Sequence, residues 1–436
     1  MKTVLSSIAA PSGSGLMAQD NIQRSLEAIR KYLDMDFAYL SEFSDEKVIF
    51  RNVDAPGFEH VLKTGDEKDL KDTYCKHVFD GRLPRLIPDT SREPGAMALP
   101  ITAQVPVSKH VGVPVVMPDG SIFGMFCCIG VQPDDSLRER DLEILEAFAH
   151  LAAIEIAHER DVARQLRERV DVIQSIIRSA DIHIAYQPLW RIGDRRPVGF
   201  ECLSRFPQQP YRPPGDWFAE AEELGLGVAL ELVAVQQALA VLPQLPSDMY
   251  LAINVSPTTV LSGSLEPILA NVTPRQVVLE ITEHAFVDDY TDLLSSLSQL
   301  RSRGFQLAVD DAGAGYSCLQ HILQLRPDLI KLDMCLTRDI DRDPARKALA
   351  SALVRFARDT GCRIIAEGVE TEAELRTLHS IGVAKAQGYL LGRPMPFSAA
   401  MQIVEGADPS AEAEEPCSPP ASMDLADQMS AASAGR

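Results

Sequence analysis

Hydrophobic and polar positions change their period near residue 181, and this change divides the chain into two parts. Before it, apolar residues at helical spacing predict a helix over residues 20–33. Four strands that pair as two hairpins are predicted next, at residues 37–43, 48–53, 111–117 and 121–131. A helix, antiparallel strands and a middle rich in Gly and Pro predict an α+β domain over residues 16–158.

A long helix is predicted over residues 137–180. Apolar residues recur alternately every three and four positions from Leu142 to Ile177, with Glu159 as the exception in this series. Such heptad spacing is typical of a two-stranded coiled coil, and it predicts a homodimer formed through the connecting helix. The alternative is an amphipathic helix that packs only on its own domains.

After residue 181, short apolar segments alternate with amphipathic ones. The predicted strands are residues 182–187, 198–204, 250–255, 277–281, 306–310, 329–332, 363–366 and 383–389. The predicted helices between them are residues 228–242, 290–303, 316–325, 344–359 and 372–381. This order predicts a modified (β/α)8 TIM-like barrel over residues 181–406. Residues 189–197 are too few for a parallel crossover, so the first strand is expected to be antiparallel to the second.

The composition restricts the expected cellular location of the protein and its expected partners. The formal net charge of −20 argues against a nucleic-acid polymer as partner. The longest apolar runs fall short of the roughly 20 residues of a membrane span, so we expect no membrane insertion. The eight cysteines lack CxxC spacing, which is typical of reduced, cytoplasmic proteins. Residues 1–15 are predicted to be a disordered lead-in, and residues 407–436 a disordered acidic tail.

Polar residues gather at the carboxyl ends of the predicted barrel strands. Asp310 and Asp311 follow the apolar run 307–309 directly. Neighbouring carboxylates repel each other, so two hard divalent cations would stabilise them. The alternative is that one aspartate caps the next helix and the other is exposed to solvent. The other strand ends offer Glu201, Asn254, Glu280, Lys331, Asp333, Glu367 and Gln387. A barrel brings these ends to one face, and oxygen ligands alone favour two Mg²⁺ or Mn²⁺ over zinc.

Seven short motifs carry a resemblance to a known family. They are Glu201-Cys-Leu-Ser-Arg205, Asn254-Val-Ser256, Glu280-Ile-Thr-Glu283, Asp310-Asp311, Lys331-Leu-Asp333, Glu367-Gly-Val-Glu370 and Gln387-Gly-Tyr389. Residues 181–405 thereby resemble the EAL-type cyclic-di-GMP phosphodiesterases, although Cys202 stands where the family name has Ala. The resemblance implies metal-dependent hydrolysis of cyclic di-GMP to linear pGpG. The alternative is an inactive cyclic-di-GMP receptor that relays to a partner protein.

The resemblance also implies a role for each residue of these motifs. The implied metal ligands are Glu201, Asn254, Glu280, Asp310 and Asp311, with Glu367 either a ligand or a base. Lys331 is expected to orient the attacking water or neutralise developing charge, and Glu283 to anchor the loop after the fifth strand. The implied substrate-binding residues are Gln187, Leu203, Arg205, Asp333, Glu370 and Gln387. The family usually has an aromatic residue and two hydroxyls where this chain has Ala312, Ala314 and Cys318, which puts the coupling of that loop to a barrel dimer in doubt.

Residues 18–158 resemble a GAF sensory domain in the order of their elements. This implies a pocket for a small ligand that the sequence does not identify. Cys75 could carry a bilin or sense redox state, or it could be a plain buried thiol. A further interpretation makes this domain the principal function, with the barrel as its output.

Overall fold

The computed structural model describes residues 16–281, 290–312 and 322–406. The chain divides after Arg169 into two compact units.

The first unit is built on a six-stranded antiparallel sheet in the order β3-β2-β1-β6-β5-β4. The strands are β1 (Phe37–Ser44), β2 (Lys47–Asp54), β3 (Glu67–Asp69), β4 (Leu86–Ile87), β5 (Lys109–Val116) and β6 (Ile122–Gly130). The two hairpins predicted from the sequence are β1–β2 and β5–β6, and β1 and β6 join them at the centre of the sheet.

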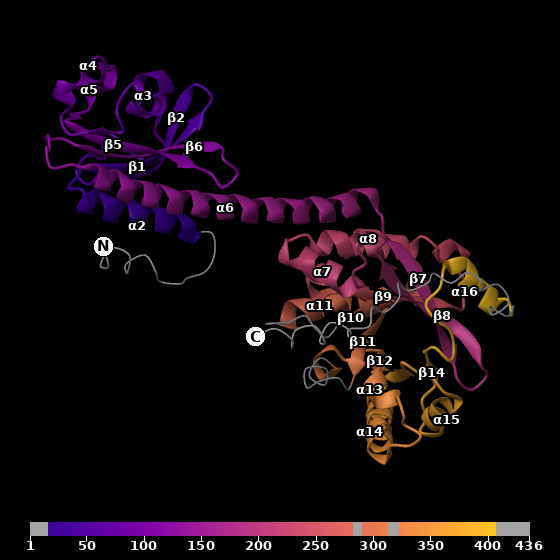
Figure 1. Ribbon diagram of the computed structural model, residues 1–436. Coiled ribbons are helices and arrows are strands. Elements are labelled where there is room, and N and C mark those ends of the chain that lie inside the picture. Colours follow the sequence, from indigo (N-terminus) through magenta and orange to yellow (C-terminus); the bar gives the residue numbers. More distant parts are fainter. Residues whose placement is uncertain (1–15, 282–289, 313–321, 407–436) are drawn as a thin grey trace, which may run out of the picture. The chain divides into compact units, whose positions relative to one another are not determined.

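Each face of this sheet has its own core, because successive residues of a strand point to opposite sides. Helix α2 (Leu16–Tyr32) and the first part of α6 (Glu139–Ser179) cover one face (Figure 1). The other face carries η1 (Leu70–Asp72), α3 (Tyr74–Phe79), η2 (Thr90–Arg92), α4 (Pro94–Met97) and α5 (Pro100–Gln104). Cys128 packs in the first core, whereas Cys127 packs in the second.

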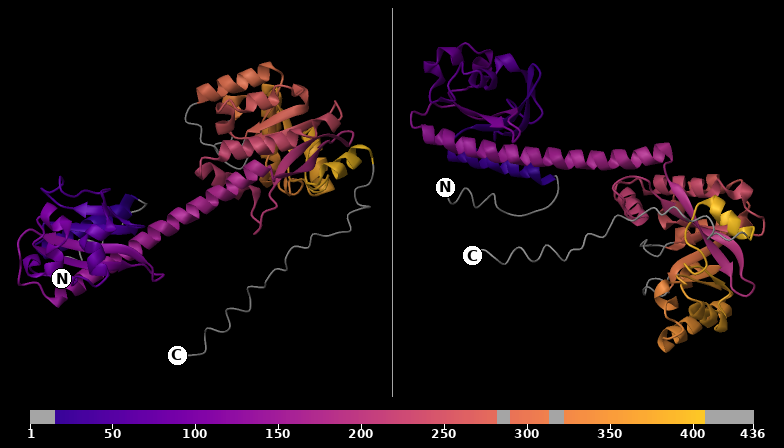
Figure 2. Two further views of the ribbon diagram at one scale, coloured as in Figure 1. Left: turned by 90° about the horizontal axis from the view of Figure 1, so that it is seen from above. Right: turned by 45° about the vertical axis from the view of Figure 1, so that its right-hand side comes forward.

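Helix α6 is continuous from Glu139 to Ser179, as both views in Figure 2 show. Its predicted heptad positions fall into three groups. Those from Leu142 to Ile156 are buried in the core of the first unit, and Ile173 is buried in the second unit. Leu166, which lies between the groups, is 48% exposed. Packing on its own domains therefore explains both ends of the pattern, and the coiled-coil dimer stays a prediction.

The second unit is a closed barrel in the order β10-β11-β12-β13-β14-β7-β8-β9. Its strands are β7 (His183–Arg191), β8 (Arg196–Arg205), β9 (Tyr250–Val255), β10 (Val277–Ile281), β11 (Gln306–Ala312), β12 (Leu329–Leu332), β13 (Arg363–Ala366) and β14 (Lys385–Ala386). Strand β7 is antiparallel to both neighbours, whereas the other pairs are parallel. The predicted antiparallel first strand is thus confirmed.

Helices surround this barrel on its outside (Figure 1). They are α7 (Pro214–Glu223), α8 (Gly227–Leu239), η3 (Leu242–Gln244), α9 (Pro257–Leu261), α10 (Leu265–Leu269), η4 (Pro274–Gln276), α11 (Tyr290–Ser302), α13 (Met334–Thr337), α14 (Pro344–Thr360), α15 (Glu372–Ser380) and α16 (Phe397–Val404). The segment Gly227–Gln244 is apolar and long enough to cross a membrane by length and composition. In the barrel, however, Leu230 and Val235 of α8 are buried in hydrophobic cores, so α8 is a core helix.

Several boundaries differ from the prediction; β7, for example, is His183–Arg191 and not residues 182–187. The predicted strand 383–389 pairs only as Lys385–Ala386, because the backbone of Gln387 bonds to Ala366 and Val369 instead of continuing the ladder. The helices that were not predicted include α7, α9, α10, α13 and α16. Most of the predicted helix 316–325 lies outside the described residues.

Candidate active site

The barrel interior has two layers, which follow from the alternation of side chains along each strand. The lower layer is apolar and includes Leu189, Ala252, Val278, Ala308, Leu329 and Ile365. Two positions nearer the carboxyl end of each parallel strand, the inward residue is polar instead. This second layer includes Asn254, Glu280, Asp310, Lys331 and Glu367. The apolar layer thus closes the barrel beneath a set of charged groups at the carboxyl ends of its parallel strands.

Three carboxylates from three strands converge in this polar layer. Glu201 on β8, Glu280 on β10 and Asp310 on β11 each offer an oxygen, and these oxygens all lie within 4.8 Å of one another. Across residues 16–281, 290–312 and 322–406, this is the one group of three such side chains close enough to share a metal ion. The prediction that acids far apart in sequence meet at one point agrees with this geometry.

The ammonium group of Lys331 lies at the centre of the acids. Its Nζ is 3.2 Å from Glu201 Oε1, 3.0 Å from Glu280 Oε2 and 3.1 Å from Asp310 Oδ2. It is also 2.8 Å from Glu367 Oε1. Lys331 is only 1% exposed, so these four carboxylates take the place of bulk water around its ammonium group. Its sequence motif gave no sign that one lysine would contact four carboxylates.

Burial and mutual repulsion shift the pKa values of these groups. Burial resists the charged form of Lys331, but the four carboxylates outweigh it and hold its pKa well above the usual range. Burial, together with Asp310 and Glu201, raises the pKa of Glu367 to about 8 against the opposing pull of Lys331. Burial likewise raises the pKa of Glu280 well above its ordinary value.

Glu201 behaves differently because it has more hydrogen-bond donors. Burial opposes its ionisation, yet Lys331 and the amides of Gln387 and Asn254 outweigh that effect and lower its pKa. Gln387 Nε2 donates to Glu201 Oε2 at 2.6 Å and to Glu367 Oε1 at 3.0 Å. Gln387 therefore fixes two carboxylates at once, which its prediction as a substrate-binding residue did not include.

Gly388 allows this close approach. A Cβ at this position would lie 2.2 Å from both the backbone N and O of Val369, and its φ of +156° is one that other residues rarely adopt. The chain can therefore bring Gln387 against the segment that carries Glu367.

The donor set fits a hard divalent cation. All candidate ligands are carboxylate or amide oxygens, which Mg²⁺ and Mn²⁺ prefer. Glu280 Oε1 is buried without a hydrogen-bond partner among the described atoms, although a buried carboxylate oxygen normally has one. Its unused lone pairs are available to a cation.

A cavity of about 860 Å³ lies between the ends of β8 and β9 and the helices α7 and α8, and Asn254 of the polar layer borders it. Leu203, Arg205 and Asn254 all line it. This volume falls within the range of sites that hold drug-sized ligands. The guanidinium of Arg205 bonds to the carbonyl of Ser204 at 2.8 Å and is only partly buried, so it is accessible to an anion.

The remaining predicted residues occupy separate places. Gln187 is paired with Glu201 across the β7–β8 ladder, and its amide donates to the carbonyl of Gly392 at 3.2 Å. Asp333 accepts the N–H of Cys335 and caps α13. Glu370 forms an exposed ion pair with Arg338 at 2.5 Å. Among the described atoms, neither Asp333 nor Glu370 has a hydrogen bond or ion pair to Glu201, Glu280 or Glu367.

Four of the predicted residues have no described side chain. Glu283, Ala314, Cys318 and the side chain of Asp311 lie outside the described residues. Ala312 is fully buried in the barrel core at the end of β11.

Sequence reasoning missed the helical wall of the cavity. Phe218 on α7 and Glu231 on α8 line it, and burial raises the pKa of Glu231, which accepts the backbone N–H of Ser256 at 2.7 Å. The start of α7 did carry a signal. Pro214 stands at the first helical position and Asp216 in the first turn, which is a common helix beginning.

Known proteins share this architecture. The chain matches the EAL domain family over residues 166–394, more than half of its length, and the GAF domain family over residues 18–157. An uncharacterized signaling protein of Caulobacter vibrioides is 31% identical over 315 residues, which are 67% of this chain and 39% of that protein. The cyclic di-GMP phosphodiesterase RocR of Pseudomonas aeruginosa is 32% identical over 267 residues, which are 58% of this chain and 68% of RocR.

Among solved structures, a manganese and cyclic di-GMP complex of Klebsiella pneumoniae BlrP1 is 34% identical, covers 49% of this chain and 56% of that chain, and has a TM-score of 0.45. The chain spans less than half the length of several curated relatives, between 32% and 39% for the Caulobacter protein and two rhizobial ones. The chain belongs to the EAL domain family, related to the cyclic di-GMP phosphodiesterases, and carries a GAF domain ahead of its EAL domain.

Proposed function

We propose that this chain is an active phosphodiesterase that hydrolyses cyclic di-GMP to linear pGpG. The observation that carries the proposal is the buried group Glu201, Glu280 and Asp310, whose oxygens lie close enough together to share an ion. Relatives 32% identical to this chain bear the name cyclic di-GMP phosphodiesterase, and this supports the choice of substrate.

The loss of folding stability that these buried carboxylates cause supports an active enzyme over a passive receptor. Several carboxylates buried together repel one another and lose hydration, which destabilises the fold unless cations compensate. A receptor that only binds the ligand gains nothing from this arrangement, whereas a hydrolase needs it.

We assign the metal ligands as Glu201, Asn254, Glu280, Asp310 and Asp311. When bound there, two Mg²⁺ or Mn²⁺ ions would shield the phosphate charge and lower the pKa of water at the site. Everything else is the work of the chain's own side chains.

Lys331 and Glu367 are assigned to proton and charge handling. The ammonium of Lys331 stays protonated because four carboxylates surround it, so it can stabilise negative charge on the phosphate as the P–O3′ bond breaks. Glu367 is assigned to take the proton of the attacking water, because its carboxylate lies in the same cluster, 2.8 Å from Lys331. Gln387 holds the Glu367 carboxylate in place.

The other assignments concern substrate and regulation. Arg205 and Leu203 line the cavity; Arg205 is assigned to a phosphate of the substrate and Leu203 to a guanine base. The other substrate-binding candidates are Gln187, Asp333, Glu370 and Gln387. Glu283 is assigned as the anchor of the loop after the fifth strand. We further propose that the GAF domain binds a small ligand that regulates turnover. A homodimer through α6 and the barrel, and a cytoplasmic location, complete the proposal.

The experiment is a turnover assay on the purified chain. Cyclic di-GMP and Mg²⁺ are added, and products are separated by chromatography and identified by mass. Wild type is expected to yield pGpG, Glu201→Gln and Asp310→Asn to yield none, and Arg205→Ala to raise KM. Tight binding of an uncleaved ligand by wild type would reject hydrolysis and leave the receptor.

A further inference from the structure

Two buried cysteines meet on the α3 face of the sensory sheet. Cys75 lies in α3 and Cys127 in β6, and both are 0% exposed. Their side chains pack in the same core, and each shifts the pKa of the other. The hydroxyls of Tyr39 and Ser41 each lie 3.6 Å from Cys75 Sγ, and Tyr39 is the residue paired with Cys127 across β1 and β6. Two strands and a helix thus supply one compact sulfur and hydroxyl cluster.

These contacts make the two sulfurs unequal. The hydrogen bond from Cys127, together with those from Tyr39 and Ser41, outweighs burial and lowers the pKa of Cys75 to about 7. Burial raises the pKa of Cys127 well above its usual value. One sulfur therefore has thiolate character beside a second that stays a thiol, which is the asymmetry of an attacking and a resolving cysteine.

His110 is an independent indication that a small polar molecule can bind next to Cys127. Both of its ring nitrogens are buried without a hydrogen-bond partner among the described atoms. A Cβ at Gly112 would lie 2.8 Å from His110 Cε1 and 2.9 Å from Cys127 Sγ, so the imidazole and the sulfur border the same point. Leaving a buried polar group unpaired costs about 1–3 kcal/mol, and a visiting molecule could use its free donor and acceptor.

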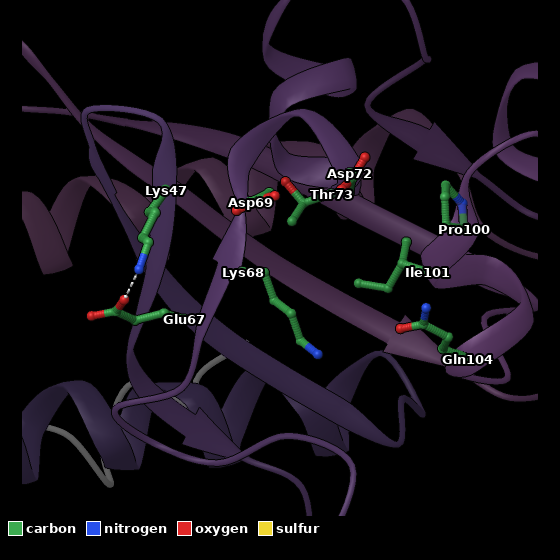
Figure 3. Close-up of a pocket in the computed structure, with 9 residues that line it drawn as sticks. All are labelled: Lys47, Glu67, Lys68, Asp69, Asp72, Thr73, Pro100, Ile101 and Gln104. Atoms are coloured by element: carbon green, nitrogen blue, oxygen red, sulfur yellow. Dashed lines mark hydrogen bonds and ion pairs between the residues drawn. The ribbon is translucent and has the colours of Figure 1, made fainter.

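Two adjoining pockets lead from the surface of the sensory domain toward the cluster. A cavity of about 30 Å³ is bordered by Tyr39, whose hydroxyl contacts Cys75 Sγ, so one side chain separates the cavity from the sulfurs. It shares Lys68, Thr73 and Ile101 with an outer pocket of about 260 Å³, whose charged rim and Lys47–Glu67 ion pair appear in Figure 3. The inner volume has room for a water-sized molecule. A small oxidant fits there, and a thiol peptide does not.

A metal site is the competing interpretation, and the distances disfavour it. Among the residues that the structure describes, the acidic group in the barrel alone has three candidate ligand atoms within 4.8 Å of one another. His110, Cys75 and Cys127 do not meet that condition together, whereas a disulfide needs only the two adjacent sulfurs.

We propose that Cys75 and Cys127 form a reversible dithiol–disulfide pair in the sensory domain, oxidised by a hydroperoxide as small as hydrogen peroxide. The Cys75 thiolate attacks one peroxide oxygen, the O–O bond breaks, and Cys75 sulfenic acid and hydroxide form. The Cys127 thiol then attacks the Cys75 sulfur, the S–O bond breaks, and a disulfide and water result. Overall, two thiols and one peroxide give one disulfide and two waters.

The test measures the bond itself in the full-length protein. Reduced protein is treated with hydrogen peroxide or, separately, with glutathione disulfide, alkylated after denaturation and digested. Peroxide is expected to produce a Cys75–Cys127 linked peptide that dithiothreitol removes, and glutathione disulfide to produce none. Cys127→Ala should stop at a sulfenic acid on Cys75 that dimedone traps.

Cys128→Ala is the matched control. It removes the neighbouring buried cysteine, which packs on the opposite face of the same strand, and it should leave the linked peptide unchanged. Cys75 and Cys127 both remaining alkylatable at a dose that oxidises the exposed Cys335 would overturn the proposal. A bound metal that Cys75→Ala or Cys127→Ala releases would also overturn it. The wild-type measurement needs neither a folded variant nor phosphodiesterase turnover.

Discussion

Lys331→Met tests the charge balance of the barrel most sharply. The methionine keeps much of the side-chain volume but removes the one cation among four carboxylates. In metal-free protein, Glu201, Glu280, Asp310 and Glu367 would then face one another without compensation. We expect the barrel to lose stability and turnover together, and divalent cations to restore part of the stability.

The magnitude follows from the distances. Nζ lies 2.8–3.2 Å from the four oxygens. At an effective dielectric constant of about 20, one such pair contributes roughly 5 kcal/mol before desolvation is subtracted. Breaking a buried ion pair by removing one partner costs about 3–5 kcal/mol in measured cases, and we expect a loss in that range. For a unit of this size the melting temperature would fall by roughly 10 °C.

The assay uses the chain's own fluorescence. Both tryptophans, Trp190 and Trp217, lie in the second unit, so urea unfolding followed by tryptophan emission reports the barrel alone. The measurement is made in EDTA and repeated in excess Mg²⁺. Lys347→Met, which removes an exposed lysine on α14, is the matched control and should change stability by less than about 0.5 kcal/mol. Equal unfolding midpoints for Lys331→Met and wild type in EDTA would refute the reasoning.

Three further predictions concern Glu280, His110 and Arg205. Glu280→Gln should stabilise the metal-free barrel by about 1 kcal/mol, because burial already disfavours the Glu280 carboxylate. The same substitution should abolish turnover. A lower stability of this variant than of wild type in EDTA would contradict the prediction. Burial lowers the pKa of His110 to about 3 from 6.5, so the unfolded chain binds more protons below pH 6.5. The stability from neutral His110 is therefore complete above pH 6.5 and falls by about 2 kcal/mol at pH 5. Hydrogen exchange of β5 and β6 peptides measures this loss, which His110→Leu should remove. Arg205→Lys should raise KM more than it lowers kcat, because a lysine cannot make two parallel bonds to a phosphate; an unchanged KM would exclude Arg205 from that role.

Much of the barrel was predictable because burial leaves a strong pattern in short strands. The bounds of β9, β10, β12 and β13 match the predicted segments. The antiparallel first strand followed from loop length alone, since nine residues cannot form a parallel crossover. Placing acids at strand ends was then enough to predict that Glu201, Glu280 and Asp310 converge.

The rest depended on contacts that no local pattern encodes. The sequence pattern predicts that Lys331 points inward at the end of a strand. Only the closed barrel shows that four carboxylates surround it. The heptad spacing of α6 was ambiguous because packing on a sheet and packing on a second helix select the same positions. Cys127 and Cys75 are far apart in sequence, so their pairing also required the fold.

The central claim is that the acidic group in the barrel cuts cyclic di-GMP with the help of divalent cations. Binding and turnover are measured side by side on one preparation, with Mg²⁺ and with excess EDTA. The account predicts pGpG in Mg²⁺ and intact cyclic di-GMP in EDTA. Equal production of pGpG in both conditions, or none in either while the ligand binds, would contradict it.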